Sequence, residues 1–222
     1  MYVDYALRLY KDYVKQHYAA GGVGYFNYDE LTEKERSAEY LRMKSRLAYY
    51  IDDNSSVLDY RDGYSFLEIG CGKGQNIKEL VQRFPSSKIR GFDPNNGALE
   101  ICRTGLKGVG NVEVEIGNAT DPDFWQRFSE NEVDHVVISH VLSFLTAEDL
   151  AATRRLRQYI VDQLLRVADR TVIVLDSSFL VEKGEATIAI EQNTRCFLRE
   201  SLEPYFANSQ YKGELYVAFS LE

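Results

Sequence analysis

The chain has 222 residues, of which 45% are hydrophobic and 27% charged, and it carries a net charge of −8 with a pI near 5.1. This size and composition are typical of one soluble globular domain with a substantial core. No apolar run approaches the roughly 20 residues that a membrane-spanning helix needs. No block of Lys and Arg stands out to neutralise phosphates, so the composition disfavours a nucleic-acid partner.

The N-terminal stretch MYVDYALRLYKDYVKQ is charged throughout and lacks the apolar segment of a signal peptide. Cys71, Cys102 and Cys196 are odd in number and widely spaced, so they match neither a disulfide framework nor a CxxC metal pattern. We therefore expect a cytoplasmic protein with reduced thiols and no metal site.

Two helices are predicted before the first strand. Residues 3–18 carry apolar side chains at helical spacing, and glycines at 21, 22 and 24 end this helix. Thr32 and Glu35 form a capping-box pattern, which predicts a helix that runs to about Ile51. Twelve of the 16 tyrosines lie at or before Tyr64. We expect residues 1–60 to form a helical extension or lid and residues 64–222 to form the core of a single domain.

Strands and helices are predicted to alternate from residue 65 to 176, which indicates parallel βαβ units in a doubly wound α/β fold. The strands are expected at Ser65–Ile69, Lys88–Phe92, Val112–Ile116, Val133–Ser139 and Thr171–Asp176. The helices are expected at Gln75–Phe84, Gly97–Thr104, Asp121–Phe128 (Asp121 as N-cap, Pro122 in the first turn) and Thr146–Val167. A helix at Arg195–Phe206 and a last strand at Glu214–Leu221 follow.

The segment FLEIGCGKGQN, residues 66–76, places a glycine-rich turn directly after the first strand of this unit. In a doubly wound sheet, ligands bind beyond the carboxyl ends of the strands, so the turn is a candidate binding loop. A dinucleotide fingerprint needs its third glycine at position 75, which is Gln; the third glycine is Gly74. Glu68 would also repel a pyrophosphate, whereas it suits a ligand that carries an ammonium group.

The residues from Glu68 to Gly74 resemble the first motif of the Rossmann-like (class I) S-adenosylmethionine-dependent methyltransferases. Asp93 lies 19 positions after Gly74, where the family has an acid that holds the ribose hydroxyls. Asn118 follows the third strand, where the family more often has an Asp that binds the adenine amino group; an amide oxygen can accept the same hydrogen bond. The resemblance implies a mostly parallel seven-stranded sheet with S-adenosylmethionine as cofactor. The positions it implies for cofactor binding are Glu68, Gly70, Cys71, Gly72, Gly74, Asn76, Asp93, Pro94, Asn118, Ala119, Thr120, Ser139, His140 and Val141.

Candidate catalytic and substrate residues are fewer. The resemblance places His140 at the rim of the fourth strand, near the methyl group, where it could accept a proton from the methyl acceptor or simply shape the site. In the family a helical N-terminal segment often closes over the cofactor. Tyr18, Tyr25 and Tyr28 are therefore candidates for contacts with the acceptor, or for packing. His135, inside the fourth strand, is predicted to be structural.

We interpret the chain as a methyltransferase that acts on an oxygen or nitrogen atom of a small molecule, with a homodimer as one arrangement. Three alternatives stay open: a non-catalytic protein that binds S-adenosylmethionine, a methyltransferase for protein or RNA, and a dinucleotide oxidoreductase. The residues after the fourth strand, ISHV, lack both the Asn/Asp-Pro-Pro-Tyr motif of amino-group DNA methyltransferases and the cysteine that cytosine C5 chemistry needs.

Overall fold

A computed structural model of the protein describes residues 47, 51, 60–139, 141, 142, 145, 147–175 and 216–220. The first predicted helix, most of the second and the predicted helix at 195–206 lie outside these residues. Leu47 and Ile51 are helical, and both are buried in the same apolar cluster as Phe66 of the first strand. This agrees with the predicted end of the second helix.

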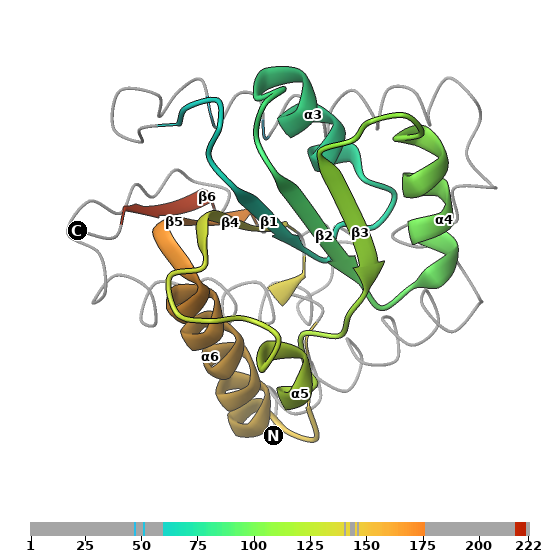
Figure 1. Ribbon diagram of the computed structural model, residues 1–222. Helices are drawn as coiled ribbons and strands as arrows, with labels where there is room; N and C mark the ends of the chain where they lie inside the picture. Colours follow the sequence, from blue (N-terminus) through green and yellow to red (C-terminus); the bar gives the residue numbers. More distant parts are fainter. Residues whose placement is uncertain are drawn as a thin grey trace.

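The described strands form one six-stranded sheet, in the order β3-β2-β1-β4-β5-β6 (Figure 1). The strands are β1 (Phe66–Ile69), β2 (Ile89–Asp93), β3 (Val112–Ile116), β4 (Val133–Ser139), β5 (Ala168–Leu175) and β6 (Tyr216–Ser220). The first five are parallel and β6 is antiparallel to β5. The predicted doubly wound, mostly parallel α/β fold is confirmed, and these residues contain six of the seven strands that the resemblance implies.

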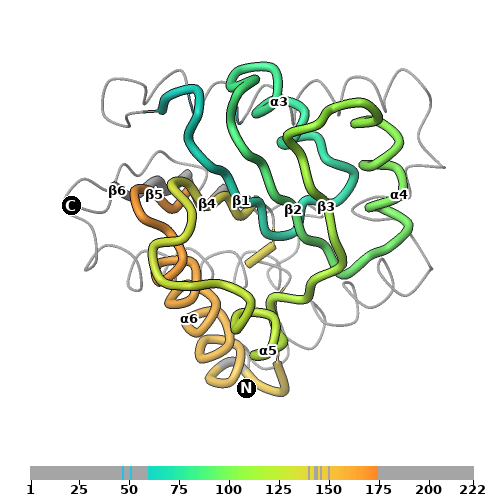
Figure 2. Tube along the Cα trace, in the orientation of Figure 1, coloured from blue at the N-terminus to red at the C-terminus, as the bar shows by residue number. Residues whose placement is uncertain are grey.

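Helices cover both faces of the sheet. Helices α3 (Gln75–Arg83) and α4 (Asn96–Gly105) lie on one face, and α5 (Pro122–Trp125) and α6 (Leu150–Val167) lie on the other (Figures 1 and 2). Each face has its own apolar cluster, and every residue of β1 is buried because both faces are covered.

The element boundaries correct several predictions. The α6 helix begins at Leu150 rather than Thr146, because Asp149 is the N-cap and its Oδ1 accepts a 2.7 Å hydrogen bond from the Ala152 N–H. Asp121 caps α5 as predicted, but that helix ends at Trp125 rather than Phe128. The β5 strand begins three residues early, at Ala168. The other described elements agree with prediction to within two residues at each end.

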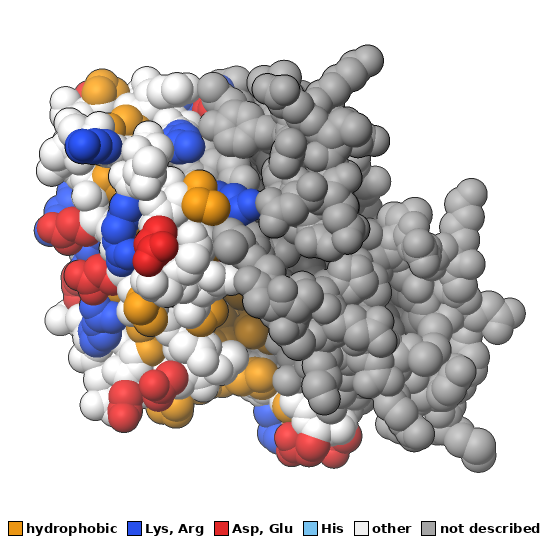
Figure 3. Space-filling view, turned by 90° about the vertical axis from the view of Figure 1, so that its right-hand side faces the viewer, with side chains coloured by type: hydrophobic (Ala, Val, Ile, Leu, Met, Phe, Trp, Pro, Cys, Tyr) orange, Lys and Arg blue, Asp and Glu red, His pale blue; other side chains and the backbone are white. Residues whose placement is uncertain are grey.

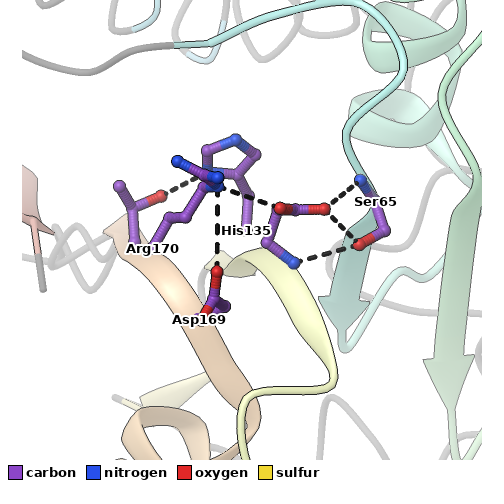
Figure 4. A network of polar contacts seen from close by, with 6 residues as sticks. Ser65, His135, Asp169 and Arg170 are labelled. Carbon is purple, nitrogen blue, oxygen red and sulfur yellow. Dashed lines mark hydrogen bonds and ion pairs between the residues drawn. The ribbon is translucent and has the colours of Figure 1, made fainter.

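A polar network joins the amino-terminal ends of the central strands (Figure 4). Oδ2 of Asp134 accepts hydrogen bonds from the N–H and the hydroxyl of Ser65, at 2.8 and 2.7 Å, and Oδ1 accepts one from Nε of Arg170. His135 is buried, with its Nδ1 2.7 Å from Oγ1 of Thr171. These contacts confirm that His135 is a structural residue, at the end of the sheet opposite the glycine turn.

The exposed face over α4 and β3 carries charges of both signs. Lys, Arg, Asp and Glu side chains are interspersed on its described part (Figure 3). On edge strand β3, Glu115 pairs with Arg127, and Arg103 donates to the carbonyl of Val114. No helix of the described residues is long and apolar enough to cross a membrane.

Candidate active site

The glycine turn lies at the topological switch point of the sheet. Strand β1 pairs with β2 on one side and with β4 on the other, and the chain leaves β1 and β4 towards helices on opposite faces (Figure 1). The carboxyl ends of adjacent strands diverge at such a point, and ligands of open α/β sheets bind there. Asp93 ends β2 and Ser139 ends β4, so both border the turn.

The glycines of the turn are required by its backbone. Gly70, Gly72 and Gly74 have φ values of +74°, +50° and +79°, which side chains disfavour. A Cβ atom on Gly70 would lie 2.2 Å from Cγ2 of Val141, and one on Gly74 would lie 2.3 Å from Sγ of Cys102. The turn is therefore packed tightly on both sides, and Gly70 and Gly74 have no room for a side chain.

Asp93 fixes the turn to β2. Its Oδ2 accepts a 2.9 Å hydrogen bond from the Gly72 N–H, and its Oδ1 accepts a 2.8 Å bond from the Asn95 N–H. The carbonyl of Phe92 accepts from the N–H groups of Gly70 and Cys71, at 2.7 and 3.0 Å. Burial raises the pKa of Asp93, and the two backbone hydrogen bonds partly offset this. Each carboxylate oxygen keeps a lone pair for a second donor.

Glu68 is the most deeply buried acid of the site, with 1% of its surface exposed. Its Oε1 accepts a 2.7 Å hydrogen bond from Nδ2 of Asn76, in the first turn of α3, whereas Oε2 is buried without a hydrogen-bond partner among the described residues. Burial raises the pKa of Glu68 to about 8, although the hydrogen bond from Asn76 opposes this and the nearby Cys102 and Asp93 add to it. A buried acceptor without a donor is costly, so this oxygen marks where a donor from a ligand would be stabilising.

Asn118 lies after β3, beside the end of β2, and its side chain is committed to a local turn. Its Oδ1 accepts from the N–H and the hydroxyl of Thr120, at 3.0 and 2.8 Å. Ala119 is buried, and its carbonyl accepts a 2.8 Å bond from the indole of Trp125. Asn118 is exposed, as a residue at the rim of a site would be.

The structure brings most of the predicted cofactor residues together, and the predicted catalytic and substrate residues are not among those it describes. Val141 packs against Gly70, Ser139 is half-buried, and Pro94 is exposed beside Asp93. His140, the predicted catalytic residue, and Tyr18, Tyr25 and Tyr28, the predicted substrate residues, lie outside the described residues, and so do the other tyrosines up to residue 50.

Three residues of this site were missed by the sequence prediction. Asn95 is the N-cap of α4 and donates its N–H to Asp93; an Asn two residues after a strand-end acid and just before a helix was the available signal. Gly91 of β2 leaves room for the Cys71 side chain of the turn, because a Cβ on Gly91 would lie 2.9 Å from Sγ of Cys71. Cys102 hydrogen-bonds to Cys71, which raises the pKa of the Cys71 thiol and lowers that of Cys102. Nothing in the spacing of two distant cysteines indicated this pair.

Comparison with known sequences identifies the domain. Residues 66–162 match a family model described as a methyltransferase domain. Trans-aconitate 2-methyltransferase of Acidovorax sp. (strain JS42) is 35% identical over 52 residues, which are 23% of this chain and 20% of that protein. The nonribosomal peptide synthetase kk1B of Curvularia clavata is 29% identical over 114 residues, which are 49% of this chain and 1% of that protein. The chain therefore spans a fifth or less of the length of these relatives.

Comparison with solved structures agrees on the fold. A SAM-dependent methyltransferase from Aquifex aeolicus superposes with a TM-score of 0.52 at 16% identity, covering 81% of this chain and 98% of that one. At this identity the superposition shows that the two proteins share a fold, and it says nothing about the activity of this chain. The strand order, the glycine turn between two acids and the matched family model together show that residues 66–162 form a methyltransferase domain of the Rossmann-like (class I) S-adenosylmethionine-dependent kind.

Proposed function

We propose that this protein transfers the methyl group of S-adenosylmethionine to an oxygen or nitrogen atom of a small-molecule acceptor. The observation that carries the proposal is the buried Oε2 of Glu68, without a hydrogen-bond donor among the described residues, beside a turn whose three glycines have positive φ values. S-adenosylmethionine fits these residues, since its ammonium group offers the donor that this carboxyl lacks.

Each group of the cofactor has a candidate partner in the chain. The free lone pairs of Asp93 are suited to the two ribose hydroxyls. The amide of Asn118 is suited to the adenine amino group if its turn with Thr120 opens or shares its oxygen. When bound, the cofactor supplies a methyl group on a sulfonium, which is already a good leaving group. The remaining task of the protein is to align the acceptor and exclude water.

Three observations support a small acceptor. The net charge is −8, and the described face over α4 and β3 has charges of both signs rather than a basic stripe (Figure 3). Trans-aconitate 2-methyltransferase, a relative over 52 residues, is named for a small organic acid. We further propose that Tyr18, Tyr25 and Tyr28 contact the acceptor and that His140 accepts its proton.

A methylation screen tests this function. The protein would be incubated with S-adenosylmethionine and sets of small carboxylic acids, phenols and amines, and formation of S-adenosylhomocysteine would be measured. We expect turnover with at least one set, and loss of turnover in Asp93→Ala. Turnover only with peptides or RNA would overturn the choice of acceptor, and tight cofactor binding without any turnover would support a non-catalytic binding protein instead.

The role of His140 has a separate test. If His140 is the general base, His140→Ala and His140→Gln lower kcat by roughly 10²–10⁴-fold while the affinity for S-adenosylhomocysteine changes little. The acid limb of the kcat profile, set by the imidazole, is lost in both variants. An unchanged kcat in His140→Gln would show that the acceptor reacts without this base. An acceptor oxygen that is already ionised, as in a carboxylate, would behave in this way because it has no proton to lose.

A further inference from the structure

The carboxyl group of Glu68 has surroundings that favour its neutral form when no ligand is bound. It is 1% exposed, and it lies at the centre of the sheet between Gly91 of β2 and Val137 of β4, its register partners. Among the described residues, only the neutral amide of Asn76 donates a hydrogen bond to it. A buried carboxylate that lacks a positive partner is strongly destabilised, and such a group takes up a proton instead.

The titratable neighbours of Glu68 reinforce this preference. On β2 the nearest is Asp93, and on α4 it is Cys102; both raise the pKa of Glu68. In the turn, Glu68 contributes to the raised pKa of the Cys71 thiol, which therefore stays neutral and supplies no charge of either sign to Glu68. The described groups that act on Glu68 from these elements are acids and thiols, and the α3 contact is the uncharged Asn76. With burial as the main cause, the pKa of Glu68 is raised to about 8.

We propose that binding of S-adenosylmethionine makes Glu68 release its proton, so that cofactor binding and proton release are coupled. This inference rests on the proposed function, because it needs a cationic ligand beside Oε2. The ammonium or sulfonium group of the ligand supplies the charge that Glu68 lacks, and an ionised carboxylate accepts a stronger hydrogen bond than a neutral one. The proton passes to the solvent, and Asn76 holds the carboxyl in place through Oε1.

The coupling has a definite pH dependence. An acid with a pKa near 8 is about 90% protonated at pH 7 and about half protonated at pH 8. Glu68 should therefore contribute a release of about 0.9 protons at pH 7, about 0.5 at pH 8 and about 0.1 at pH 9, from which the proton uptake of the ligand amino group is subtracted. The association constant should rise about tenfold between pH 6 and pH 7, and it should fall again above about pH 8, where the ligand amino group loses its proton.

Isothermal titration calorimetry tests the inference directly. S-adenosylhomocysteine, which carries the ammonium group, and S-adenosylmethionine, which carries both cations, would be titrated into the full chain. The observed enthalpy, plotted against the ionisation enthalpy of several buffers at one pH, has a slope equal to the number of protons released. Net release at pH 7 that fades towards higher pH, with either ligand, is the expected result. Binding without release would overturn the inference, whereas absence of binding would instead overturn the proposed function.

Two variants assign the proton to Glu68. Glu68→Gln keeps an acceptor for Asn76 but has no proton to lose, so its release should disappear and leave only the pH-dependent proton uptake of the ligand amino group. Asn76→Ala removes the hydrogen bond that lowers the pKa of Glu68, so its release should persist to a higher pH than in the wild type. Equal release by wild type and Glu68→Gln would show that another group supplies the proton. If Glu68→Gln does not bind, an unshifted profile in Asn76→Ala would equally contradict the assignment.

Discussion

The backbone N–H of Gly72 donates a 2.9 Å hydrogen bond to Oδ2 of Asp93, which joins the glycine turn after β1 to the end of β2. The same carboxylate receives the Asn95 N–H at its other oxygen. Asp93 therefore has two tasks: it shapes the turn before any ligand arrives, and it keeps lone pairs for a ligand. A site that is held in place in this way loses less entropy when the ligand binds.

Asp93→Ala should weaken binding of S-adenosylhomocysteine by roughly 10- to 100-fold, because it removes an ionised acceptor and frees the Gly72 N–H. Titration calorimetry measures the change, and thermal unfolding would show that the variant is folded. Asp123→Ala, at an exposed acid of α5, is the matched control and should bind as the wild type does. Equal affinity in Asp93→Ala would remove Asp93 from the proposed site.

Gly70→Ala and Gly74→Ala should each destabilise the protein and weaken cofactor binding. The positive φ alone costs roughly 1–2 kcal/mol for a residue with a Cβ, and the contacts with Val141 and Cys102 should add about 1–3 kcal/mol. Chemical denaturation measures the free energy of unfolding.

Gly108→Ala separates these two effects. Gly108 has a φ of +89° but open space around its Cβ position, so this variant should show the backbone cost only. The double variant Gly74→Ala/Cys102→Ala should recover part of the loss of Gly74→Ala, because the atom that the new methyl meets is removed. Equal losses of stability in Gly70→Ala, Gly74→Ala and Gly108→Ala would show that the positive φ values, and not the contacts with Val141 and Cys102, require glycine in the turn.

Glu68→Gln should be more stable than the wild type in the absence of ligand. The pKa of Glu68 is raised by folding, so the unfolded chain loses this proton at a lower pH and the wild type loses stability as the pH rises from about 4.3 towards 8. Gln does not titrate, so the stability of Glu68→Gln lacks this pH dependence. The difference in unfolding free energy between Glu68→Gln and the wild type should grow to about 2 kcal/mol or more by pH 8. Unfolding by urea at pH 5 to 8 measures it, with exposed Glu100→Gln as control. A difference that does not depend on pH would contradict the raised pKa.

Asp134→Asn should destabilise the protein at pH 7 by about 1–3 kcal/mol, because an amide cannot accept the hydrogen bonds of both Ser65 and Arg170. Burial alone would raise the pKa of Asp134, but these hydrogen bonds outweigh it and the pKa lies below its usual range. The wild type therefore has this stability above about pH 4 and loses it as the pH falls through the lowered pKa.

The penalty of Asp134→Asn should accordingly shrink towards pH 3, which urea unfolding at several pH values would show. Asp169→Asn is a suitable comparison, because Asp169 is 3.8 Å from the same Arg170 and both side chains are more than 40% exposed. Its effect should stay within about 0.5 kcal/mol. A penalty of Asp134→Asn that persists unchanged at pH 3 would indicate lost packing rather than lost charge.

The strands were predictable because their residue patterns are local. Val112–Ile116 and Val133–Ser139 were predicted with the bounds that the structure has. The second is an apolar run typical of a buried strand, whereas the first, VEVEI, alternates apolar and charged residues and lies at the end of the strand order. The start of α6 was predicted four residues early, because Thr146 and Asp149 can both precede a helix and only the hydrogen bond from Ala152 selects Asp149. Boundaries of this kind depend on which of several competing caps the fold can use.

The sequence by itself determined the fold class and the positions of the glycine turn and of Asp93, because these follow from spacing along the chain, and its resemblance to a known family indicated the cofactor. The tertiary structure decided what surrounds each group. It showed that Asp93 bonds to the turn, that Cys102 and Val141 limit Gly74 and Gly70, and that Glu68 is buried with one oxygen unmatched. Burial and pKa depend on atoms from strands and helices distant in the chain, which no local pattern contains.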